Sequence, residues 1–238
     1  MRRQIIIPLL LGFLVLGIIL YLYDRSIWVP LYRSIKGKRS VGEVISLYGP
    51  GAENRTLRFF QAAGVAYPPT AITMIALKAE RRLELWAQDG STWRPVKTYE
   101  IKGASGKPGP KLREGDLQVP EGIYGIEGLN PNSSYHLSIK LNYPNTFDVE
   151  HAKIDGRTEL GGDIFIHGKD VSIGCLAMGD EAIEELFVLV SRIGIENVTV
   201  IIAPQDFRKH IVEPRRDLPL WVSELYTIIH QELLSYKL

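Results

Sequence analysis

The single cysteine of the chain lies in the stretch Ile166-His167-Gly168-Lys169-Asp170-Val171-Ser172-Ile173-Gly174-Cys175-Leu176. Cys175 follows His167 by eight positions, and His167 ends an apolar run and precedes a glycine. A cysteine close to a histidine, in a loop with glycines on both sides, is typical of a thiol nucleophile and its base. A single Cys–His pair is nevertheless a weak signal. The spacing fits equally well a small buried cysteine and a histidine at a strand end.

The nucleophile hypothesis makes specific demands on this stretch. A cysteine attacks as the thiolate, so its surroundings are expected to lower its pKa. His167 would take the proton if its ring comes within hydrogen-bond reach. The backbone N–H groups of Gly174 and Cys175 are the natural candidates for an oxyanion hole. Asp180 is expected to cap a helix that begins at Glu181, whose positive end would also favour the thiolate.

Outward from this stretch, most of the preceding chain has the pattern of β-strands. Short apolar or alternating runs are separated by Gly, Pro, Asn and charged residues, which predicts a mainly antiparallel sheet or sandwich. The predicted strands are 72–77, 83–86, 93–101, 122–129, 135–141 and 164–166, and residues 198–203 read as a further, buried strand.

Three stretches have helical spacing of their apolar residues. The helix after Asp180 has Ile183, Leu186, Phe187 and Val190 on one stripe, and a last helix is predicted over about 219–236. A modest helical pattern over 53–64 could pack on the domain. These apolar stripes are interpreted as core contacts.

Composition excludes several classes of function. The 238 residues carry a formal net charge of +1, with 45% hydrophobic and 23% charged residues, which is ordinary for a globular chain. The sequence has no basic helix and no interleaving of aromatic and basic residues, so it predicts no nucleic-acid partner. The histidines lack metal-ligand spacing, so neither a metal nor a cofactor is expected. The glycine-rich run 103–109 lacks Ser or Thr after its lysine, so it is interpreted as a flexible connection or a flap rather than a phosphate loop.

The N-terminus has the pattern of an uncleaved membrane anchor. The run 5–23 carries no charge, and about 20 such residues span a bilayer as a helix. The residues after it offer no small-residue cleavage site. Basic residues lie on both sides of the run, and the larger group follows it, so charge alone favours the topology opposite to the one adopted below. Residues 25–69 are expected to form a stalk with short helical pieces.

Several separated motifs, in order, resemble one known family. The central ones are Ile166-His167-Gly168 with Ser172-Ile173-Gly174-Cys175, and Val119-Pro120-Glu121-Gly122-Ile123-Tyr124. They resemble the L,D-transpeptidase catalytic domain (YkuD-type), whose members are cysteine enzymes acting on peptidoglycan stem peptides. Its YafK-like branch is matched by the runs 111–116, 129–133, 143–145 and 155–157. The resemblance covers roughly residues 71–207.

The resemblance implies roles for the residues of the central motif. Cys175 would be the nucleophile, His167 the base, and the backbone carbonyl of Gly168 would orient the imidazole. Two positions depart from the family pattern: Ile173 stands where most members have histidine, and Ala177 where many have arginine. Both departures concern substrate and acceptor rather than the attack itself.

The implied fold is mainly β with flanking helices (α+β), a β-sandwich-like catalytic domain. The implied organisation is an anchor at 1–24, a stalk at 25–69, the catalytic domain at 70–207 and a C-terminal helical extension at 208–238. The substrate would be reached from the inner (cytoplasmic) membrane, with a single span and the domain on the periplasmic side. The partners would then be stem peptides and the lipid bilayer, while the oligomeric state is undetermined.

The predicted activity is acyl transfer through a Cys175 thioester. Hydrolysis of the same wall linkage by an amidase or carboxypeptidase reaction remains open, because both outcomes share the first half-reaction. A non-catalytic, membrane-tethered wall-binding scaffold is the alternative from another class. Further candidates for substrate binding are Ser172, Tyr143, Asn145 and Arg157; for Arg157 a structural salt bridge is an equal alternative.

Overall fold

The structure is a computed structural model that describes residues 12–15, 17, 32, 37–210 and 213–237. The chain divides into residues 1–40 and a folded unit of residues 41–238. Most of the expected span, residues 5–23, lies outside the described residues. Within the part that is described, none of the helices combines the length and the apolar character needed to cross a bilayer.

Two neighbouring strands form the centre of the folded unit, β1 (Ile72–Leu77) and β9 (Val198–Ala203). All of β1 and nearly all of β9 is buried, because both sheet faces are covered there. The two strands pair in parallel, with Ile72 opposite Val198 and Leu77 opposite Ala203. Most strand pairs are antiparallel, as predicted, and this pair is one of the parallel exceptions. Continuous apolar runs are typical of such doubly covered parallel strands.

The strands form two sheets. The five-stranded sheet has the order β3-β2-β1-β9-β4, and the four-stranded sheet has the order β5-β6-β7-β8. The remaining bounds are Arg82–Asp89 (β2), Thr92–Glu100 (β3), Gly122–Tyr124 (β4), Ile126–Asn130 (β5), Ser138–Leu141 (β6), Phe165–His167 (β7) and Leu176–Ala177 (β8). The strand expected over 122–129 is split at Gly125, so its two halves belong to different sheets.

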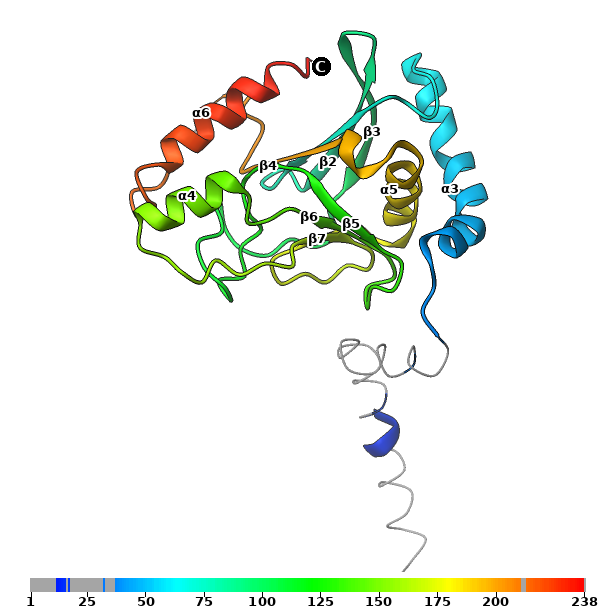
Figure 1. Cartoon of the computed structure of the whole chain (residues 1–238), viewed down its shortest axis with the longest axis horizontal. Helices are drawn as coiled ribbons and strands as arrows, with labels where there is room; N and C mark the ends of the chain where they lie inside the picture. Colours follow the sequence, from blue (N-terminus) through cyan, green and yellow to red (C-terminus); the bar gives the residue numbers. More distant parts are fainter. Residues whose placement is uncertain (1–11, 16, 18–31, 33–36, 211–212, 238) are drawn as a thin grey trace, which may run out of the picture. The chain divides into compact units, whose positions relative to one another are not determined.

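The larger core lies between one face of the five-stranded sheet, the four-stranded sheet and two helices. These helices are α3 (Val41–Ala63) and α5 (Asp180–Ile193), which lie side by side in Figure 1. Alternate residues of β1, such as Met74, face this core. The apolar stripe of α5 faces it too, with Ile183, Leu186 and Phe187 fully buried. A short 3₁₀ helix, η1 (Ile195–Asn197), connects α5 to β9.

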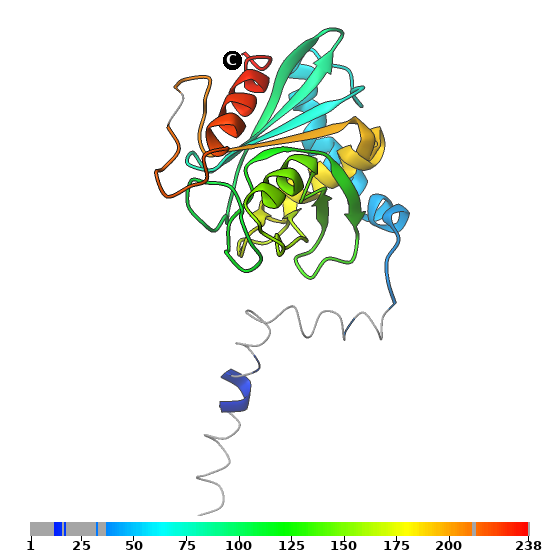
Figure 2. The same ribbon diagram turned by 60° about the vertical axis from the view of Figure 1, so that its left-hand side comes forward.

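A second, smaller core lies on the other face of the five-stranded sheet. The helix α6 (Val222–Leu233) packs there against Trp86 of β2 and Ile201 of β9. Figures 1 and 2 show α6 on one side of this sheet and α3 and α5 on the other. The segment predicted as a C-terminal extension therefore contributes a core of its own. Without it, the second face of the central strands would be exposed to water.

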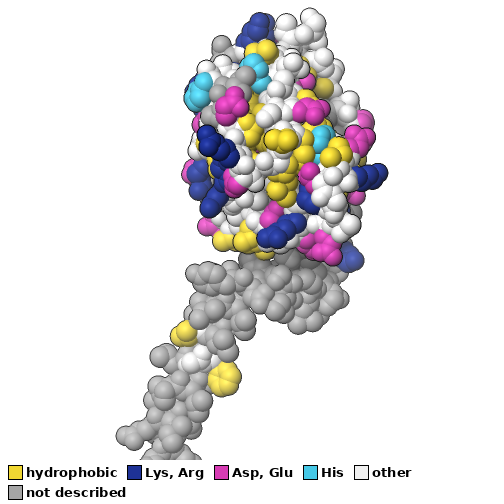
Figure 3. Space-filling model, turned by 90° about the vertical axis from the view of Figure 1, so that its left-hand side faces the viewer, with side chains coloured by type: hydrophobic (Ala, Val, Ile, Leu, Met, Phe, Trp, Pro, Cys, Tyr) yellow, Lys and Arg dark blue, Asp and Glu magenta, His cyan; other side chains and the backbone are white. Residues whose placement is uncertain are grey.

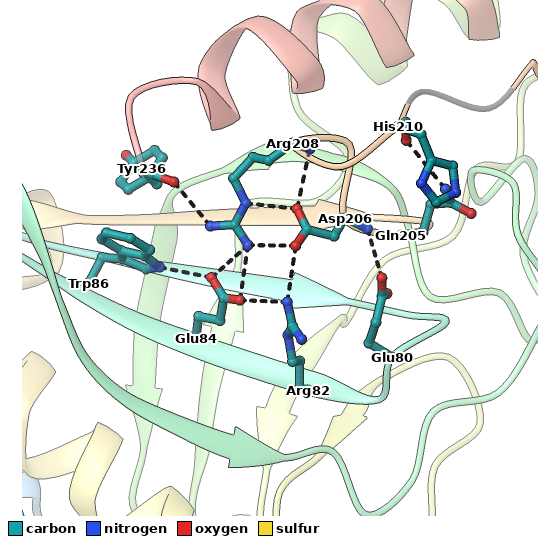
Figure 4. A network of polar contacts seen from close by, with 9 residues as sticks. All are labelled: Glu80, Arg82, Glu84, Trp86, Gln205, Asp206, Arg208, His210 and Tyr236. Atoms are coloured by element: carbon teal, nitrogen blue, oxygen red, sulfur yellow. Dashed lines mark hydrogen bonds and ion pairs between the residues drawn. The ribbon is translucent and has the colours of Figure 1, made fainter. Parts of the chain in front are cut away.

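A network of charged side chains fastens the segment after β9 to the same sheet (Figure 4). The guanidinium of Arg208 binds the carboxylate of Glu84 at 2.9 Å and that of Asp206 at 2.7 Å. It also donates to the backbone carbonyl of Tyr236 at 3.2 Å. Arg82 binds Asp206 from the opposite side at 3.0 Å. Because these groups are shielded from water, they order the chain on both sides of α6.

The helix α3 begins well before the short helical pattern predicted at 53–64. It spans 23 residues, although Pro50 lies inside it. Its Arg55 binds Glu184 at 2.9 Å and the buried Glu185 at 3.0 Å, both on α5. These ion pairs and the burial of Phe60 attach α3 to the rest of the folded unit. Tertiary contacts supply here the stability that the helical pattern alone does not.

Helix α4 (Thr146–Ile154) was not predicted, although the sequence holds its signal. The side chain of Asn145 accepts from the backbone N–H of Asp148, and Asp148 accepts from the backbone N–H of Asn145. This reciprocal pair is a capping box.

The face of the molecule shown in Figure 3 mixes basic, acidic and apolar side chains, so no single sign of charge dominates it.

Taken together, the described residues form a mixed α+β fold with two sheets and flanking helices.

Candidate active site

The pairing of β7 with β8 brings His167 and Cys175 together. The two strands are parallel, with Ile166 opposite Leu176 and His167 opposite Ala177. Ile166 and Leu176 point into the larger core. Cys175 is two residues before Ala177, so it shares the face of His167. Their Cα atoms are then about 8 Å apart, a diagonal distance that an imidazole and a thiol can bridge.

The ring of His167 is buried and fixed on one side. Its Nδ1 lies 2.6 Å from the backbone carbonyl oxygen of Gly168. A carbonyl oxygen can only accept, so Nδ1 carries the proton and donates it. In the neutral ring, Nε2 is then the free base. The ring of Tyr135 packs on the imidazole with 4.7 Å between the centroids. Burial lowers the pKa of His167 below its ordinary 6.5, so the ring is neutral at physiological pH.

Only glycine fits at position 168. A Cβ there would lie 2.7 Å from the backbone oxygen of Tyr135, 2.7 Å from a carboxylate oxygen of Asp180 and 3.0 Å from Cβ of His136. The Gly168 N–H donates to the Leu137 carbonyl at 3.2 Å. The carbonyl that holds the imidazole is therefore set by close backbone packing rather than by a flexible side chain.

The predicted capping role of Asp180 is wrong. The N-cap of α5 is Gly179, with a positive φ of 82°, and no side chain caps this helix. Asp180 is instead the first helical residue, and its carboxylate accepts from the backbone N–H of Lys169 at 3.0 Å and binds the ammonium of Lys169. The Gly179 N–H donates to the Lys169 carbonyl at 2.9 Å. These contacts tie the loop between His167 and Cys175 to the start of α5.

Ser172 holds the turn that presents Cys175. Its hydroxyl donates to the Cys175 carbonyl at 2.6 Å and accepts from the Cys175 N–H at 2.8 Å. Gly174 has a φ of +115°, a conformation that side chains rarely adopt. In this structure the Cys175 N–H is thus engaged by Ser172, although it was expected to bind an oxyanion. The Gly174 N–H remains the candidate from the predicted pair.

The thiol of Cys175 is partly buried and protonated. Burial raises its pKa above the ordinary 9.0, although the Phe165 backbone N–H lowers it in part. The sulfur donates to the backbone carbonyl of Asp163, 3.8 Å away. The expectation of surroundings that lower this pKa is therefore not met, because desolvation outweighs the stabilising groups. The resting pair is a neutral thiol beside a neutral imidazole.

An open groove of about 470 Å³ is lined in part by Asp163. The backbone carbonyl of Asp163 accepts from the Cys175 thiol. The remaining lining residues are Glu127, Lys140, Asn142, Tyr143, Pro144 and Gly162. Ligand sites in proteins generally have volumes of about 300–1,000 Å³, so this groove has the size to accept a peptide side chain.

The other predicted binding residues have structural contacts. Tyr143 lines the groove, but its hydroxyl is buried and donates to the Leu160 carbonyl at 3.2 Å. Asn145 caps α4 and donates to the Ile123 carbonyl at 3.0 Å. Arg157 binds Asp155 at 2.9 Å and the Leu112 carbonyl at 2.8 Å. Of the three, only Tyr143 borders the groove.

Sequence reasoning missed the groove residues Glu127, Lys140 and Asp163, and Tyr135 on the imidazole. No motif marks them, because three separate segments bring the groove residues together. The pairing of β5, β6 and β7 sets this arrangement, with Lys140 opposite both Gly128 and Phe165. Gly103 belongs to the glycine-rich run 103–109, which was interpreted as a flexible connection or a flap. It pairs with Ala177 of β8 and packs against the Asp170 carbonyl.

Among the described residues, no group of three His, Cys, Asp or Glu side chains could hold a metal ion. His167 ends β7, and Cys175 directly precedes β8, the parallel neighbour of β7. Such a pair can carry out acyl transfer without a cofactor.

The sequence and fold were compared with known proteins. The family model for YkuD, the L,D-transpeptidase catalytic domain, matches residues 71–202, which is more than half of the chain. The chain belongs to this family.

YafK of Escherichia coli strain K12, provisionally named an L,D-transpeptidase, is 38% identical over 116 residues. The match covers 48% of this chain and 45% of YafK, so the chain spans about half the length of its curated relative.

Two solved structures show a distant likeness. Pgp2 of Campylobacter jejuni, named a helical cell shape determining protein, is 24% identical with a TM-score of 0.47. The match covers 59% of this chain and 50% of Pgp2. Bd1075 of Bdellovibrio bacteriovorus is 19% identical with a TM-score of 0.42, and the match covers 72% of this chain and 57% of Bd1075.

Proposed function

We propose that the protein is a cysteine acyltransferase that acts on peptidoglycan stem peptides, in the manner for which its family is named. Two observations support the proposal: the parallel register of β7 and β8, at whose ends His167 and Cys175 lie, and a groove of ligand size lined by Asp163, whose carbonyl accepts from the thiol. Membership of the L,D-transpeptidase catalytic-domain family supports the substrate class.

In the first half-reaction, Nε2 of His167 takes the proton from Sγ of Cys175 as the sulfur attacks the carbonyl of the scissile amide. The C–S bond forms and the C–N bond breaks, and the imidazolium gives its proton to the leaving amine. The product is a thioester on Cys175. In the resting structure the thiol donates to Asp163, so its proton turns from that carbonyl toward the imidazole when substrate binds.

In the second half-reaction an acceptor resolves the thioester. His167 takes a proton from an amine of a neighbouring stem or from water. The acceptor attacks the thioester carbonyl, the C–S bond breaks, and the proton returns to sulfur. An amine gives a cross-link and water gives a shortened peptide. The geometry serves both outcomes equally, because neither acceptor requires a different base.

Because the Cys175 thiol and the His167 imidazole both start neutral, the proposed reaction depends mainly on general-base catalysis by His167. With the pKa of Cys175 raised and that of His167 lowered, the thiolate forms only as the proton leaves for the imidazole. Desolvation disfavours a resting ion pair but strengthens the attack once the thiolate forms, since the sulfur is then poorly solvated. A slow resting reaction with alkylating reagents is consequently compatible with catalysis, and it does not separate an enzyme from a scaffold.

Analysis of the reaction products distinguishes an enzyme from a non-catalytic scaffold. We would incubate the purified protein with muropeptides and identify the products by mass spectrometry. We expect dimers or shortened monomers from the wild type. With Cys175→Ala or His167→Gln, the rate of product formation should fall by roughly a thousandfold or more. His230→Gln, on α6, is the matched control and should keep wild-type activity. If Cys175→Ala processes the substrate as well as the wild type does, the proposed chemistry is wrong, and a binding scaffold remains.

We also propose that residues 5–23 anchor the protein in the inner membrane, with the catalytic unit on the periplasmic side. The uncharged run of this length and the location of the proposed substrate support the anchor. A reporter active only outside the cytoplasm, fused after residue 238, should be active in whole cells. Activity of a cytoplasm-specific reporter at the same position would refute this topology.

A further inference from the structure

A buried ion pair lies in the turn formed by residues 111–118, and the proposed mechanism does not use it. The Lys111 ammonium binds the Asp116 carboxylate at 2.7 Å and donates to the Arg113 carbonyl at 2.9 Å. The exposed fraction of the side chain is 6% for Lys111 and 13% for Asp116. The same carboxylate accepts from three backbone N–H groups, those of Leu112, Arg113 and Gln118. The pair therefore fixes the turn and holds the ammonium in one place.

This turn contacts the chain immediately before Cys175. The Gln118 carbonyl oxygen would lie 3.4 Å from a Cβ at Gly174, which is van der Waals contact. The side-chain oxygen of Gln118 accepts from the Lys107 N–H at 2.9 Å, which holds the end of the turn from the other side. The backbone beside the sulfur is therefore packed against the turn that carries Lys111.

The same turn contacts the chain before Asp163, whose carbonyl accepts from the thiol. The Glu114 N–H donates to the Glu159 carbonyl at 2.9 Å. The Cα of Glu114 would lie 3.1 Å from a Cβ at Gly161. The turn thus lies against both stretches of chain that surround the sulfur, and it holds the Lys111 ammonium near the thiol.

Two charged side chains act on the Cys175 thiol in opposite directions. Burial is the main cause of the raised pKa of this thiol; the Asp163 carboxylate raises the pKa further, and the Lys111 ammonium lowers it. The Asp163 side chain is 79% exposed, so water and salt screen its charge. The Lys111 side chain is almost fully buried, so its charge is screened much less. We therefore expect the ammonium to act more strongly on a charged sulfur than the carboxylate does.

The proposed reaction needs a charge of this sign. The thiol and the imidazole both start neutral, so negative charge develops on the sulfur only as its proton leaves for His167. A fixed cation in a site that excludes water stabilises such charge without having to reorient. Lys111 meets both conditions, because Asp116 holds it and the surrounding chain covers it.

We propose that Lys111, held in place by Asp116, stabilises the Cys175 sulfur through its charge when the sulfur becomes a thiolate. Lys111 keeps its proton in this step, and the thiol proton goes to Nε2 of His167. The role in turnover rests on the proposed function, whereas the effect on the thiol requires no substrate.

The first test measures the ionisation of Cys175 without a substrate. Cys175 is the only cysteine in the chain, so the rate of alkylation by iodoacetamide over a range of pH reports on this thiol alone. The full chain is compared with the double variant Lys111→Met, Asp116→Asn, which leaves neither buried charge without its partner. Below the wild-type midpoint, the double variant should react about threefold to tenfold more slowly, because loss of a nearby cation raises the pKa of a thiol.

The direction of the change separates charge from structure. If the pair only held the turn together, its loss would loosen the packing on Gly174 and expose the thiol to water. Exposure lowers the pKa of a buried thiol and speeds alkylation, which is the opposite result. Lys111→Gln, which can still donate to Asp116, takes the place of the double variant if that variant does not fold.

Two further variants serve as controls. Lys111→Arg keeps the charge and the partner, so it should retain the wild-type titration of the thiol. Lys97→Met is the matched control, because Lys97 also forms a shielded ion pair, with Glu185, where β3 meets α5. It should be alkylated at the wild-type rate.

Muropeptide turnover gives the second readout. The double variant should lose about threefold to tenfold in kcat. KM should be nearly unchanged, because Lys111 is not one of the residues that line the groove.

Two results would overturn the inference. One is alkylation of the double variant at the wild-type rate or faster, and the other is an unchanged kcat. If the double variant is alkylated more slowly but the wild type converts no muropeptide, the effect of Lys111 on the thiol stands and the proposed function fails instead.

Discussion

Replacement of Gly168 by alanine tests how the imidazole of His167, the proposed base, is held. The added Cβ would lie 2.7 Å from the Tyr135 backbone oxygen and 2.7 Å from Asp180, whereas ordinary contacts begin at 3.4 Å. The backbone at 168 must therefore move by about 0.7 Å, because the Tyr135 oxygen belongs to the backbone and cannot rotate away. The same movement displaces the carbonyl oxygen that accepts from Nδ1 of His167 at 2.6 Å.

The expected magnitudes follow from this displacement. Overpacking of a buried position costs about 1–3 kcal/mol of unfolding free energy. A misplacement approaching 1 Å in a catalytic site can cost about 100-fold in rate. Gly168→Ala should therefore remain folded but lose about two orders of magnitude in kcat/KM. The loss should be mostly in kcat, because Gly168 does not line the groove that is proposed to bind the substrate.

The assay combines thermal unfolding with muropeptide turnover. Gly128→Ala is the matched control, since a Cβ at Gly128 meets nothing within 4 Å. It should match the wild type in both measurements. Wild-type kcat/KM in a folded Gly168→Ala protein would refute the reasoning, because it would show that the carbonyl of residue 168 does not position the base.

Three further predictions concern pH and buried charge. First, kcat/KM should fall as pH drops below about 6.5, where the His167 ring gains a proton and loses its basic nitrogen, and alkylation of Cys175 should have its midpoint above 9.0. Second, burial raises the pKa of Asp148 from 3.8 to about 6. The folded state therefore holds this proton more tightly, and the resulting stabilisation is present below 3.8 and lost as pH rises through 6. Relative to the wild type, Asp148→Asn should gain roughly 2–3 kcal/mol between pH 4 and 7.5. Third, Lys78→Met should cost about 3–5 kcal/mol, because it leaves the fully buried Glu121 without its cation.

Each of these has a clear contrary result. A pH–rate profile that stays flat down to pH 5 would contradict His167 as the base, and an alkylation midpoint near 7 would show a thiolate at rest. Equal chemical-denaturation curves for the wild type and Asp148→Asn at both pH values would show that Asp148 keeps an ordinary pKa. A cost under 1 kcal/mol for Lys78→Met would mean that Gly109 and Tyr226, which also donate to Glu121, are sufficient to hold its charge.

Local signals in the sequence predicted the secondary structure around the site. The alternating and apolar runs placed β1, β2, β3, β7 and β9 within a few residues of their observed bounds. Prediction was least accurate where tertiary contacts compete with local pattern. The strand over 122–129 divides between two sheets at Gly125, and α3 extends far beyond its helical pattern because Arg55 and Phe60 anchor it to the body.

The sequence alone was sufficient for the family, because its motifs are carried by residue types at fixed short spacing. Three features required the folded chain. The register of β7 and β8 sets the face that His167 shares with Cys175. Desolvation sets the neutral state of both groups, against the direction expected for the thiol. Strands that are distant in sequence bring Glu127, Lys140 and Asp163 to one groove. Register, burial and long-range pairing are properties of the whole packed structure, so no local pattern of residues encodes them.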